Sequence, residues 1–273
     1  MAGSETVIRW SVIVPYFNEK DYLVGTLKGL VAQRGVGFRL ILVDNGSDDG
    51  SEALARDFMR GHPDIEVVYL TETTKGKVAA MAAGARLVTT EFLAFCDADT
   101  FYPPHYLATA DRLLREGGAG VVAALAVDIY APPTARKGRS RLFWRTFISR
   151  ILTWQTHTGG CGFCFRTAAF RAAGGYSQDI WPYVLEDHEV MNRILTQGRA
   201  VYDRDFWCMP SDRRGAQISW TLGERLRYHA TPFSRQRAFF HEFLAARFAA
   251  RQATALKLRE RPWEAPPQRA GQS

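Results

Sequence analysis

Short apolar runs alternate with helical patterns over the first hundred residues of the chain. The runs occupy residues 12–14, 40–43, 65–70 and 92–96. After the first run, Leu23, Leu27 and Leu30 recur at the spacing of an amphipathic helix, and the alanine-rich stretch 78–88 predicts another helix. Strands that alternate with helices are typical of βα units. The pattern therefore predicts an α/β fold whose mainly parallel sheet is flanked by helices.

The second half of the chain is less regular. Strands are expected over residues 121–127 and 161–165, and a basic amphipathic helix is expected over 139–154. A further helix is predicted over residues 186–195, because apolar positions share one face and Gly198 follows its end.

Acid-rich loops follow the second and fourth predicted strands. Asp44 opens the polar loop 44–50, and Asp97 and Asp99 come directly after the run 92–96. Ligands of open α/β sheets collect beyond the carboxyl ends of the strands, so both loops are expected to face one crevice. Two carboxylates at i and i+2 supply hard oxygen ligands for Mg²⁺ or Mn²⁺, whereas an isolated Asp-x-Asp can also be a solvated turn.

The composition is that of a folded globular protein. With 273 residues, 47% of them hydrophobic, the chain is long enough for a sizeable core. It has no run near the ~20 apolar residues of a membrane span, and no basic region followed by an apolar run that would indicate a secretory signal. The four cysteines lack the spacing of a disulfide framework, so reduced thiols are expected. A cytoplasmic protein is predicted.

Positive charge is concentrated in two places. Residues 213–273 contain twelve Arg or Lys against four Glu, although the whole chain has a net charge of +7. Between Arg136 and Trp154, basic and aromatic residues are interleaved without an acid, which is the composition of an interfacial helix. Peripheral contact with an anionic membrane at its inner face is therefore one interpretation, and a buried aromatic stripe with a solvated arginine face is the other. Nucleic acid is not expected, since no nucleic-acid module accompanies the charge.

We divide the chain into three parts on this basis. Residues 1–212 are expected to form the α/β domain that carries the acidic loops. Residues 213–263 are expected to form a basic helical extension, and the proline-containing tail 264–273 is expected to be disordered.

Several motifs in order along the chain resemble the family-2 glycosyltransferases, inverting enzymes with the Rossmann-like GT-A fold. The resemblance rests on residues 12–19, 42–50 and 92–99, together with Lys75-Gly76-Lys77, and it extends over about residues 8–200. It implies a donor site formed by Pro15, Tyr16, Glu19, Asp44, Lys77, Asp97 and Ala98. It also implies that residues 1–212 form a nucleotide-sugar-binding and catalytic domain with a metal held by Asp97 and Asp99. His229 is a further candidate ligand, and an ordinary surface or core histidine is the other interpretation of this residue.

The pair Glu186-Asp187 is the candidate for the catalytic base. An inverting transfer needs a group that takes the proton of the acceptor hydroxyl. The resemblance implies Asp187 in this role, with Glu186 in support, although two acids at a helix start can also merely complement the helix dipole. The glycine-rich segment 158–166 resembles the acceptor side of the family, with Gly159 and Gly160 as contacts where the backbone approaches a sugar closely.

The sequence thus predicts transfer of one sugar from a nucleotide-diphosphate sugar to an acceptor hydroxyl, with a lipid-linked or cell-envelope glycan as the candidate acceptor. Single transfer is favoured because Gln217-Ile218-Ser219-Trp220 is one residue short of the Gln-x-x-Arg-Trp motif of processive synthases. A sugar nucleotidyltransferase and a non-catalytic membrane or nucleic-acid adaptor remain as alternatives. Cys161-x-x-Cys164 lacks a second pair at zinc spacing and is interpreted as coincidence.

Overall fold

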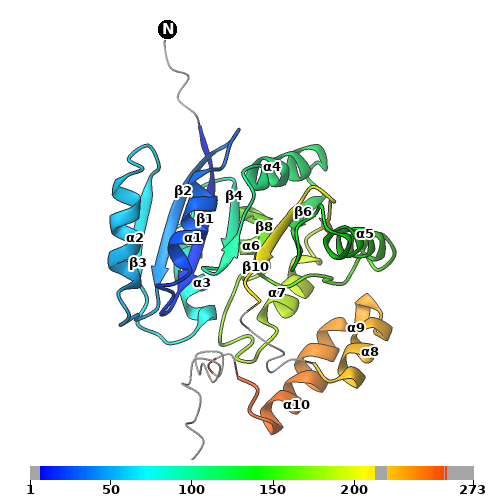
Figure 1. The fold of residues 1–273 in the computed structure, drawn as a ribbon. Helices are drawn as coiled ribbons and strands as arrows, with labels where there is room; N and C mark the ends of the chain where they lie inside the picture. Colours follow the sequence, from blue (N-terminus) through cyan, green and yellow to red (C-terminus); the bar gives the residue numbers. More distant parts are fainter. Residues whose placement is uncertain (1–6, 213–219, 255, 257–273) are drawn as a thin grey trace, which may run out of the picture.

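The computed structural model describes residues 7–212, 220–254 and 256, and a seven-stranded sheet lies at its centre (Figure 1). In spatial order the strands are β3 (Val67–Thr71), β2 (Gly37–Asp44), β1 (Ile8–Tyr16), β4 (Phe92–Cys96), β8 (Gly162–Arg166), β6 (Val121–Leu125) and β9 (Arg199–Val201). The predicted boundary at residue 212/213, the segment 217–219 and the tail 264–273 lie at or beyond the edges of the described residues.

Most strand pairs of this sheet are parallel. Strand β1 pairs in parallel with both β2 and β4, β2 with β3, and β6 with β9. Strand β8 runs antiparallel to its neighbours β4 and β6. The predicted mainly parallel α/β sheet is confirmed. The reversed β8 has a consequence for the site, because its amino end lies at the same edge as the carboxyl end of β4.

Helices cover both faces of the sheet, since alternate strand residues point to opposite sides (Figure 1). Val12 and Val14 pack with α1 (Leu23–Val31), α2 (Ser51–Arg60) and α4 (Tyr106–Glu116). Ile13 packs on the other side with α3 (Lys77–Arg86), α6 (Thr167–Ala172) and α7 (Glu186–Ile194). The strands that lead into the acidic loops are therefore held between two packed layers.

Smaller elements complete the described chain. A second sheet contains β5 (Thr100–Phe101), β10 (Trp207–Pro210) and β7 (Val127–Asp128), and the helix α5 (Arg136–Ile151) follows β7. The carboxyl-terminal helices are α8 (Leu222–Ala230), α9 (Phe233–Ala238), the π-helix η1 (Phe239–Leu244) and α10 (Ala245–Ala250). They pack through Phe240 and Phe248 onto Trp181, just before α7. None of the helices in the described part of the chain has the length and apolarity needed to cross a bilayer.

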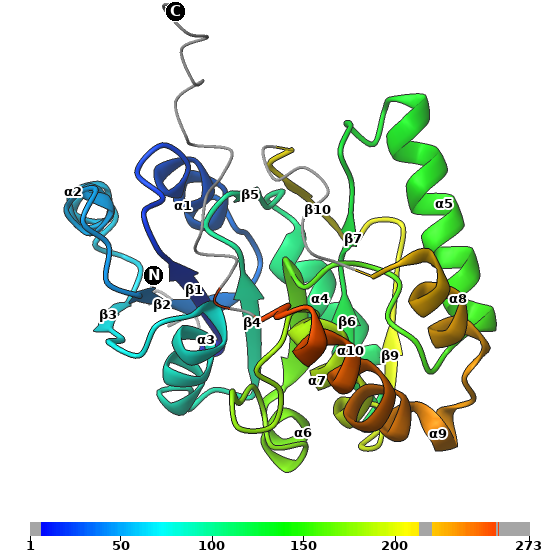
Figure 2. The same ribbon diagram turned by 90° about the horizontal axis from the view of Figure 1, so that it is seen from below.

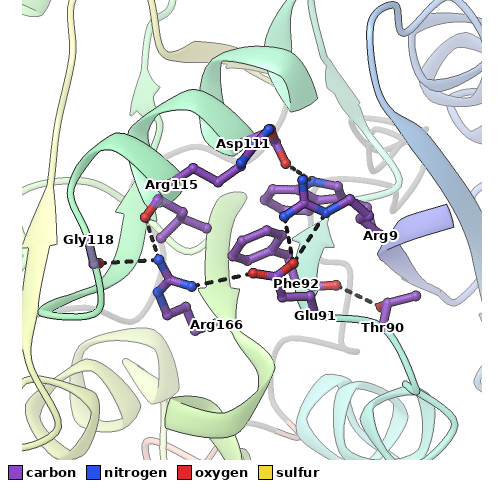
Figure 3. A network of polar contacts seen from close by, with 10 residues as sticks. Arg9, Thr90, Glu91, Phe92, Asp111, Arg115, Gly118 and Arg166 are labelled. Carbon is purple, nitrogen blue, oxygen red and sulfur yellow. Dashed lines mark hydrogen bonds and ion pairs between the residues drawn. The ribbon is translucent and has the colours of Figure 1, made fainter. Parts of the chain in front are cut away.

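A polar network ties the strands together at the edge opposite the acidic loops (Figure 3). Glu91, just before β4, pairs with Arg9 of β1 and Arg166 of β8, at N–O distances of 2.6 and 3.6 Å. Both guanidinium groups lie over the ring of Phe92, 5.5 and 5.3 Å from its centroid. One carboxylate and one ring therefore join three neighbouring strands.

The same network fixes helix α4 to the sheet. The indole Nε1–H of Trp10, which is fully buried, donates to Asp111 Oδ1 at 3.1 Å. Asp111 also pairs with Arg115 one turn further along α4, at 3.4 Å. Because the indole is shielded from water, Asp111 is its necessary acceptor.

We expect Asp111→Ala to lower the free energy of unfolding by about 1–3 kcal/mol, because it leaves the buried N–H of Trp10 without a partner. Glu116→Ala on the same helix removes an exposed ion pair with Arg112 and should cost less than about 1 kcal/mol. Urea unfolding followed by circular dichroism measures both values. Equal losses in the two variants would contradict the role given to Asp111.

Candidate active site

The carboxyl ends of β1, β2 and β4 meet at one edge of the sheet, which Figure 2 views from below. Tyr16 at the end of β1 lies opposite Asp44 at the end of β2, and both are buried. Asp44 accepts hydrogen bonds from the backbone N–H of Ser47, at 3.0 Å, and from its hydroxyl, at 2.5 Å. Pro15 lies in the same strand, and Glu19 is buried after it. The predicted donor residues of β1 and β2 are thus brought together.

Asn45 holds the loop that leads to Lys77. Its side-chain amide donates to the carbonyls of Glu72 and Thr74, at 2.9 and 2.8 Å, and its Oδ1 accepts the backbone N–H of Gly76 at 2.8 Å. Gly76 has φ +119°, a conformation that disfavours side chains, and it precedes the first residue of α3. This positioning role was missed in the sequence, although Asn45 directly follows Asp44.

Lys77 and Asp97 form an ion pair at this edge. Lys77 Nζ lies 2.5 Å from Asp97 Oδ1, and both side chains are largely buried. The backbone N–H of Asp97 donates at 2.7 Å to the hydroxyl of Tyr102, which itself donates to the carbonyl of Cys161. Tyr102 is fully buried, so the acidic loop is fixed to the glycine-rich segment that precedes β8.

Asp99 lies on the other side of Ala98, beside a cleft. Its carboxylate accepts the hydroxyl of Ser211 at 2.9 Å. The hydroxyl of Thr26 donates to the carbonyl of Ala98, at 2.9 Å, and so holds the turn between the two acids. The cleft has a volume of about 500 Å³, and its lining includes Asp99, Ser211 and Tyr130.

Asp187 is held by three polar contacts at the start of α7. Its Oδ2 accepts the backbone N–H of Gly160 at 2.8 Å, and its Oδ1 accepts the backbone N–H of His188 at 2.8 Å. The imidazole Nδ1 of His188 lies 2.9 Å from the same Oδ1. An ionised carboxylate can only accept, so Nδ1 carries the hydrogen of this contact.

Gly160 is required by its contact with Asp187. A Cβ at this position would lie 2.7 Å from the Cβ of Asp187, whereas a Cβ on Gly159 would meet no atom of the described residues within 4 Å. From the sequence, both glycines are interpreted as positions where the backbone approaches a sugar closely. For Gly160 the structure gives a different reason, namely the close approach of Asp187, the candidate base.

The two acids of α7 have opposite pKa shifts. Burial and the charge of Asp187 raise the pKa of Glu186 to about 7, although Lys77 acts to lower it. Burial also acts to raise the pKa of Asp187, but the charge and hydrogen bonds of His188 outweigh it and leave the pKa below its usual value. At neutral pH, Asp187 is therefore a charged hydrogen-bond acceptor beside a carboxyl group that holds its proton much more tightly.

His229 is not brought to the acidic loop. Its Nδ1 lies 2.6 Å from the side-chain Oε1 of Gln155, and its ring is parallel to that of His157. Within residues 7–212, 220–254 and 256, no three His, Cys, Asp or Glu side chains gather so that they could hold a metal ion. The structure therefore offers Asp97 and Asp99 without the predicted third ligand.

The cysteines are buried and free. Cys161 Sγ lies 3.4 Å from Cys208 Sγ, while Cys164 Sγ contacts the hydroxyl of Tyr106 at 3.4 Å. Burial raises the pKa of the Cys164 thiol to about 12. The residues of Cys161-x-x-Cys164 thus point to different partners, as expected for a coincidental spacing.

Sequence reasoning missed His188 and Asp128 as well. His188 directly follows the predicted acid pair, and its ring contacts the rings of Trp220 and Tyr228, at centroid distances of 5.1 and 5.9 Å. Asp128 accepts the hydroxyl of Thr158 at 2.8 Å and pairs with Arg141 at 2.5 Å, so it links the glycine-rich segment to α5. Neither contact has a signal in residue spacing.

Comparison with known proteins gives consistent results. The model of the protein family described as "Glycosyl transferase family 2" matches residues 11–174. The teichoic acid poly(glycerol phosphate) polymerase of Staphylococcus epidermidis is 25% identical over 201 residues, which is 68% of this chain and 26% of that protein. The undecaprenyl-phosphate 4-deoxy-4-formamido-L-arabinose transferase of Edwardsiella ictaluri is 30% identical over 155 residues, 56% of this chain and 44% of that protein. The chain therefore spans less than half the length of these curated relatives.

Solved structures share the fold. A mannosyltransferase from Pyrobaculum calidifontis, in complex with GDP-Man and Mn²⁺, has a TM-score of 0.65 and 24% identity, covering 84% of this chain and 62% of that one. S. aureus TarS 1–349, in complex with UDP-GlcNAc, has a TM-score of 0.59 and 18% identity, covering 89% and 73%. At these identities the likeness concerns the fold alone, and the predicted GT-A architecture is confirmed.

The raised pKa of Glu186 predicts how stability depends on pH. The folded protein binds the proton of Glu186 more tightly than the unfolded chain does, so this group stabilises the fold below its ordinary pKa of 4.5, and the stabilisation is lost as the pH rises through about 7. We expect the free energy of unfolding to fall between about pH 5 and pH 8 by more in the native chain than in Glu186→Gln. Urea titrations at the two pH values measure this difference. Glu52→Gln, which removes an exposed acid from the first turn of α2, is the control, and an identical pH response in all three proteins would refute the shift.

Proposed function

The chain belongs to glycosyl transferase family 2, and from this premise we propose that it is an inverting enzyme that moves one sugar from a nucleotide-diphosphate sugar to an acceptor hydroxyl. The observation that carries the proposal is the fixed, ionised carboxylate of Asp187 beside the Lys77–Asp97 pair. The charges of Lys77 and Asp97 both act on the pKa of Glu186, so the two groups of charged residues belong to one electrostatic environment.

The donor would bind across the ends of β1, β2 and β4. A carboxylate such as that of Asp44 suits the neutral N–H groups of a nucleobase, and the buried Tyr16 lies opposite it. The ammonium group of Lys77 suits the negative diphosphate. The nucleotide sugars named with the two solved structures of this fold, GDP-Man and UDP-GlcNAc, support this class of donor.

A divalent metal fits Asp97 and Asp99 if the phosphates of the donor complete its ligand set. Mg²⁺ and Mn²⁺ prefer oxygen ligands, and Mg²⁺ is often held by one or two carboxylates together with substrate phosphates. Two aspartates without a third protein ligand among the described residues match that kind of site and do not match an all-protein cage. When bound, the metal would neutralise charge on the departing diphosphate.

Asp187 would act as the base. Its carboxylate takes the proton of the acceptor hydroxyl while that oxygen attacks the anomeric carbon from the face opposite the diphosphate. The new C–O bond forms as the bond to the diphosphate breaks, and the electron pair leaves with the diphosphate, so the anomeric configuration inverts. Gly160 and His188 keep the carboxylate oriented and charged. Glu186, with a pKa of about 7, could donate a hydrogen bond to an acceptor oxygen.

The acceptor is proposed to be a lipid-linked or cell-envelope glycan. The names of the two curated relatives, a teichoic acid polymerase and an undecaprenyl-phosphate sugar transferase, support this class. A sugar nucleotidyltransferase is the second candidate, because it would use the same crevice to attack a phosphate. The two differ in the released product, which is a nucleoside diphosphate for a glycosyltransferase and pyrophosphate for a nucleotidyltransferase.

We expect Asp187→Asn to lower the turnover of nucleotide sugar by about 100-fold or more, because the amide cannot take a proton. Binding of the nucleoside diphosphate should persist. The measurement is release of nucleoside diphosphate from UDP-, GDP- and dTDP-sugars. Asp179→Asn, an exposed aspartate before α7, is the matched control and should turn over at the native rate. Undiminished turnover in Asp187→Asn would remove the base from the proposal, and pyrophosphate as product would favour the second candidate.

Metal binding is tested separately by thermal stability. A ligand that binds only the folded state raises the melting temperature, so UDP or GDP should raise it more in the presence of Mn²⁺ than in its absence. Asp99→Asn should abolish that metal-dependent part, while Asp57→Asn on the exposed face of α2 should keep it. A native protein whose nucleotide-induced shift is the same with Mn²⁺ and with chelator would contradict a metal at Asp97 and Asp99.

A further inference from the structure

Helix α5 turns large apolar side chains to solvent. Phe143, Trp144, Phe147 and Ile151, here called the aromatic face, are 42, 59, 47 and 57% exposed. The three rings contact one another, with centroids 5.3 to 6.1 Å apart. Contiguous exposed apolar side chains rimmed by polar ones mark an interaction site.

The opposite side of the same helix explains why these side chains point outward. The residues of α5 that are buried are Gly138, Leu142 and Thr146, at a spacing of four. A Cβ on Gly138 would lie 2.3 Å from the carbonyl oxygen of Pro132, so the backbone of α5 packs tightly there. The helix thus packs on the protein through Gly138, Leu142 and Thr146 and turns its aromatic rings outward.

Cations surround the aromatic face. Arg136, Lys137, Arg139 and Arg150 are exposed on α5, and the sequence has no Asp or Glu between Asp128 and Asp179. A hollow of about 560 Å³ on one side is lined by Arg136, Lys137, Ser140, Arg141, Trp144 and Arg145. A second hollow, of about 700 Å³, includes Arg112, Arg139, Arg204 and Phe143, and also Asp205. Each hollow therefore places guanidinium groups next to a ring of the aromatic face.

Helix α8 extends this surface. Leu222 and Leu226, one turn apart, are 74 and 62% exposed. Arg225 lies between them in sequence, and its charge is close enough to lower the pKa of Arg145 on α5, where burial is the larger cause. Gln155, which follows α5, donates to the carbonyls of Tyr228 and His229 in the last turn of α8, at 3.1 and 3.2 Å, and so joins the ends of the two helices. The apolar and basic character therefore continues from one helix to the other.

We propose that the aromatic face of α5, with Leu222 and Leu226 of α8, docks on an anionic lipid bilayer. The rings would lie at the boundary of headgroups and acyl chains, and the arginine-lined hollows would take lipid phosphates. A second copy of the chain fits poorly, because two cationic surfaces would face each other. A nucleic-acid duplex would meet the cations and leave the protruding side chains in water.

The docking surface is joined to the candidate active site. Arg141 of α5 pairs with Asp128 and lies over the ring of Tyr130, 5.2 Å from its centroid. Tyr130 in turn lines the cleft that contains Asp99. The inference rests on the proposed function only in this respect: a lipid-linked acceptor would reach the site along the surface on which the enzyme sits.

The test is flotation of the full chain with vesicles of phosphatidylcholine, with and without phosphatidylglycerol, in the absence of any nucleotide sugar. The native protein should float with the anionic vesicles only, and added salt should weaken its binding. Trp144→Ser with Phe147→Ser should lower the partition coefficient by roughly tenfold or more, as expected from the apolar surface removed. Arg136→Gln with Lys137→Gln should lower it about fivefold per charge.

Matched controls separate a docking surface from general charge. Arg56→Gln with Arg60→Gln removes the same charge from α2, at the other edge of the sheet, and should float like the native protein. Asp187→Asn should also float normally, so loss of turnover and loss of docking are distinguishable. Equal binding to neutral vesicles, no binding to either kind, or equal losses in the α2 and α5 charge variants would overturn the proposal. So would a native dimer that Trp144→Ser with Phe147→Ser dissociates, or retention on duplex DNA without flotation.

Discussion

The candidate site depends on the buried hydroxyl of Tyr102. It accepts the backbone N–H of Asp97 and donates to the carbonyl of Cys161, so one phenol joins the loop after β4 to the segment before β8. This is possible because β8 runs antiparallel to β4, with Gly162 opposite Cys96. The position of Asp187 follows from that junction. Gly160 lies two residues before β8, and its N–H in turn fixes Asp187 at the start of α7. A parallel β8 would place the glycine-rich segment at the far edge of the sheet.

The junction brings carboxylates together that would repel one another without partners. Asp97 is paired with Lys77, and Asp187 with His188 and the N–H of Gly160, while Glu186 has a pKa raised to about 7 by burial and by Asp187. Different environments thus give the two adjacent acids different pKa values, the higher one for Glu186 and the lower one for Asp187. In the proposed mechanism the base must be ionised when it meets its substrate, and its neighbour can then hold a proton. That division of roles is a property of the contacts around each acid and not of the residue pair itself.

Local signals in the sequence predicted the parallel half of the sheet. The apolar runs that became β2, β3 and β4 are each followed by polar residues, such as Asp44 after β2, which mark where the strand ends. Strand β1 instead continues through Pro15 to Tyr16. Strand direction is not a local property, so the reversal of β8 could not be predicted from residues 161–165. Strands β5 and β7 contain two residues each and are formed by their partner β10. Helix α4 was also missed, although Tyr106, Ala110 and Leu114 recur at its spacing. Asn45 and His188 act through side-chain contacts across loops, for which spacing gives no signal.

The basic segment around α5 shows a limit of periodicity of another kind. An alternation of aromatic and basic residues predicts a helix with two unlike faces, and the usual expectation is that the aromatic one is buried. In α5 the packing surface is the narrow stripe of Gly138, Leu142 and Thr146, where the helix backbone approaches the carbonyl of Pro132. The close approach of the backbone at Gly138 leaves no room for a ring on that side, so the rings lie outward. The glycine of α5, more than its tryptophan or its arginines, therefore decides which face of the helix meets the surroundings of the protein.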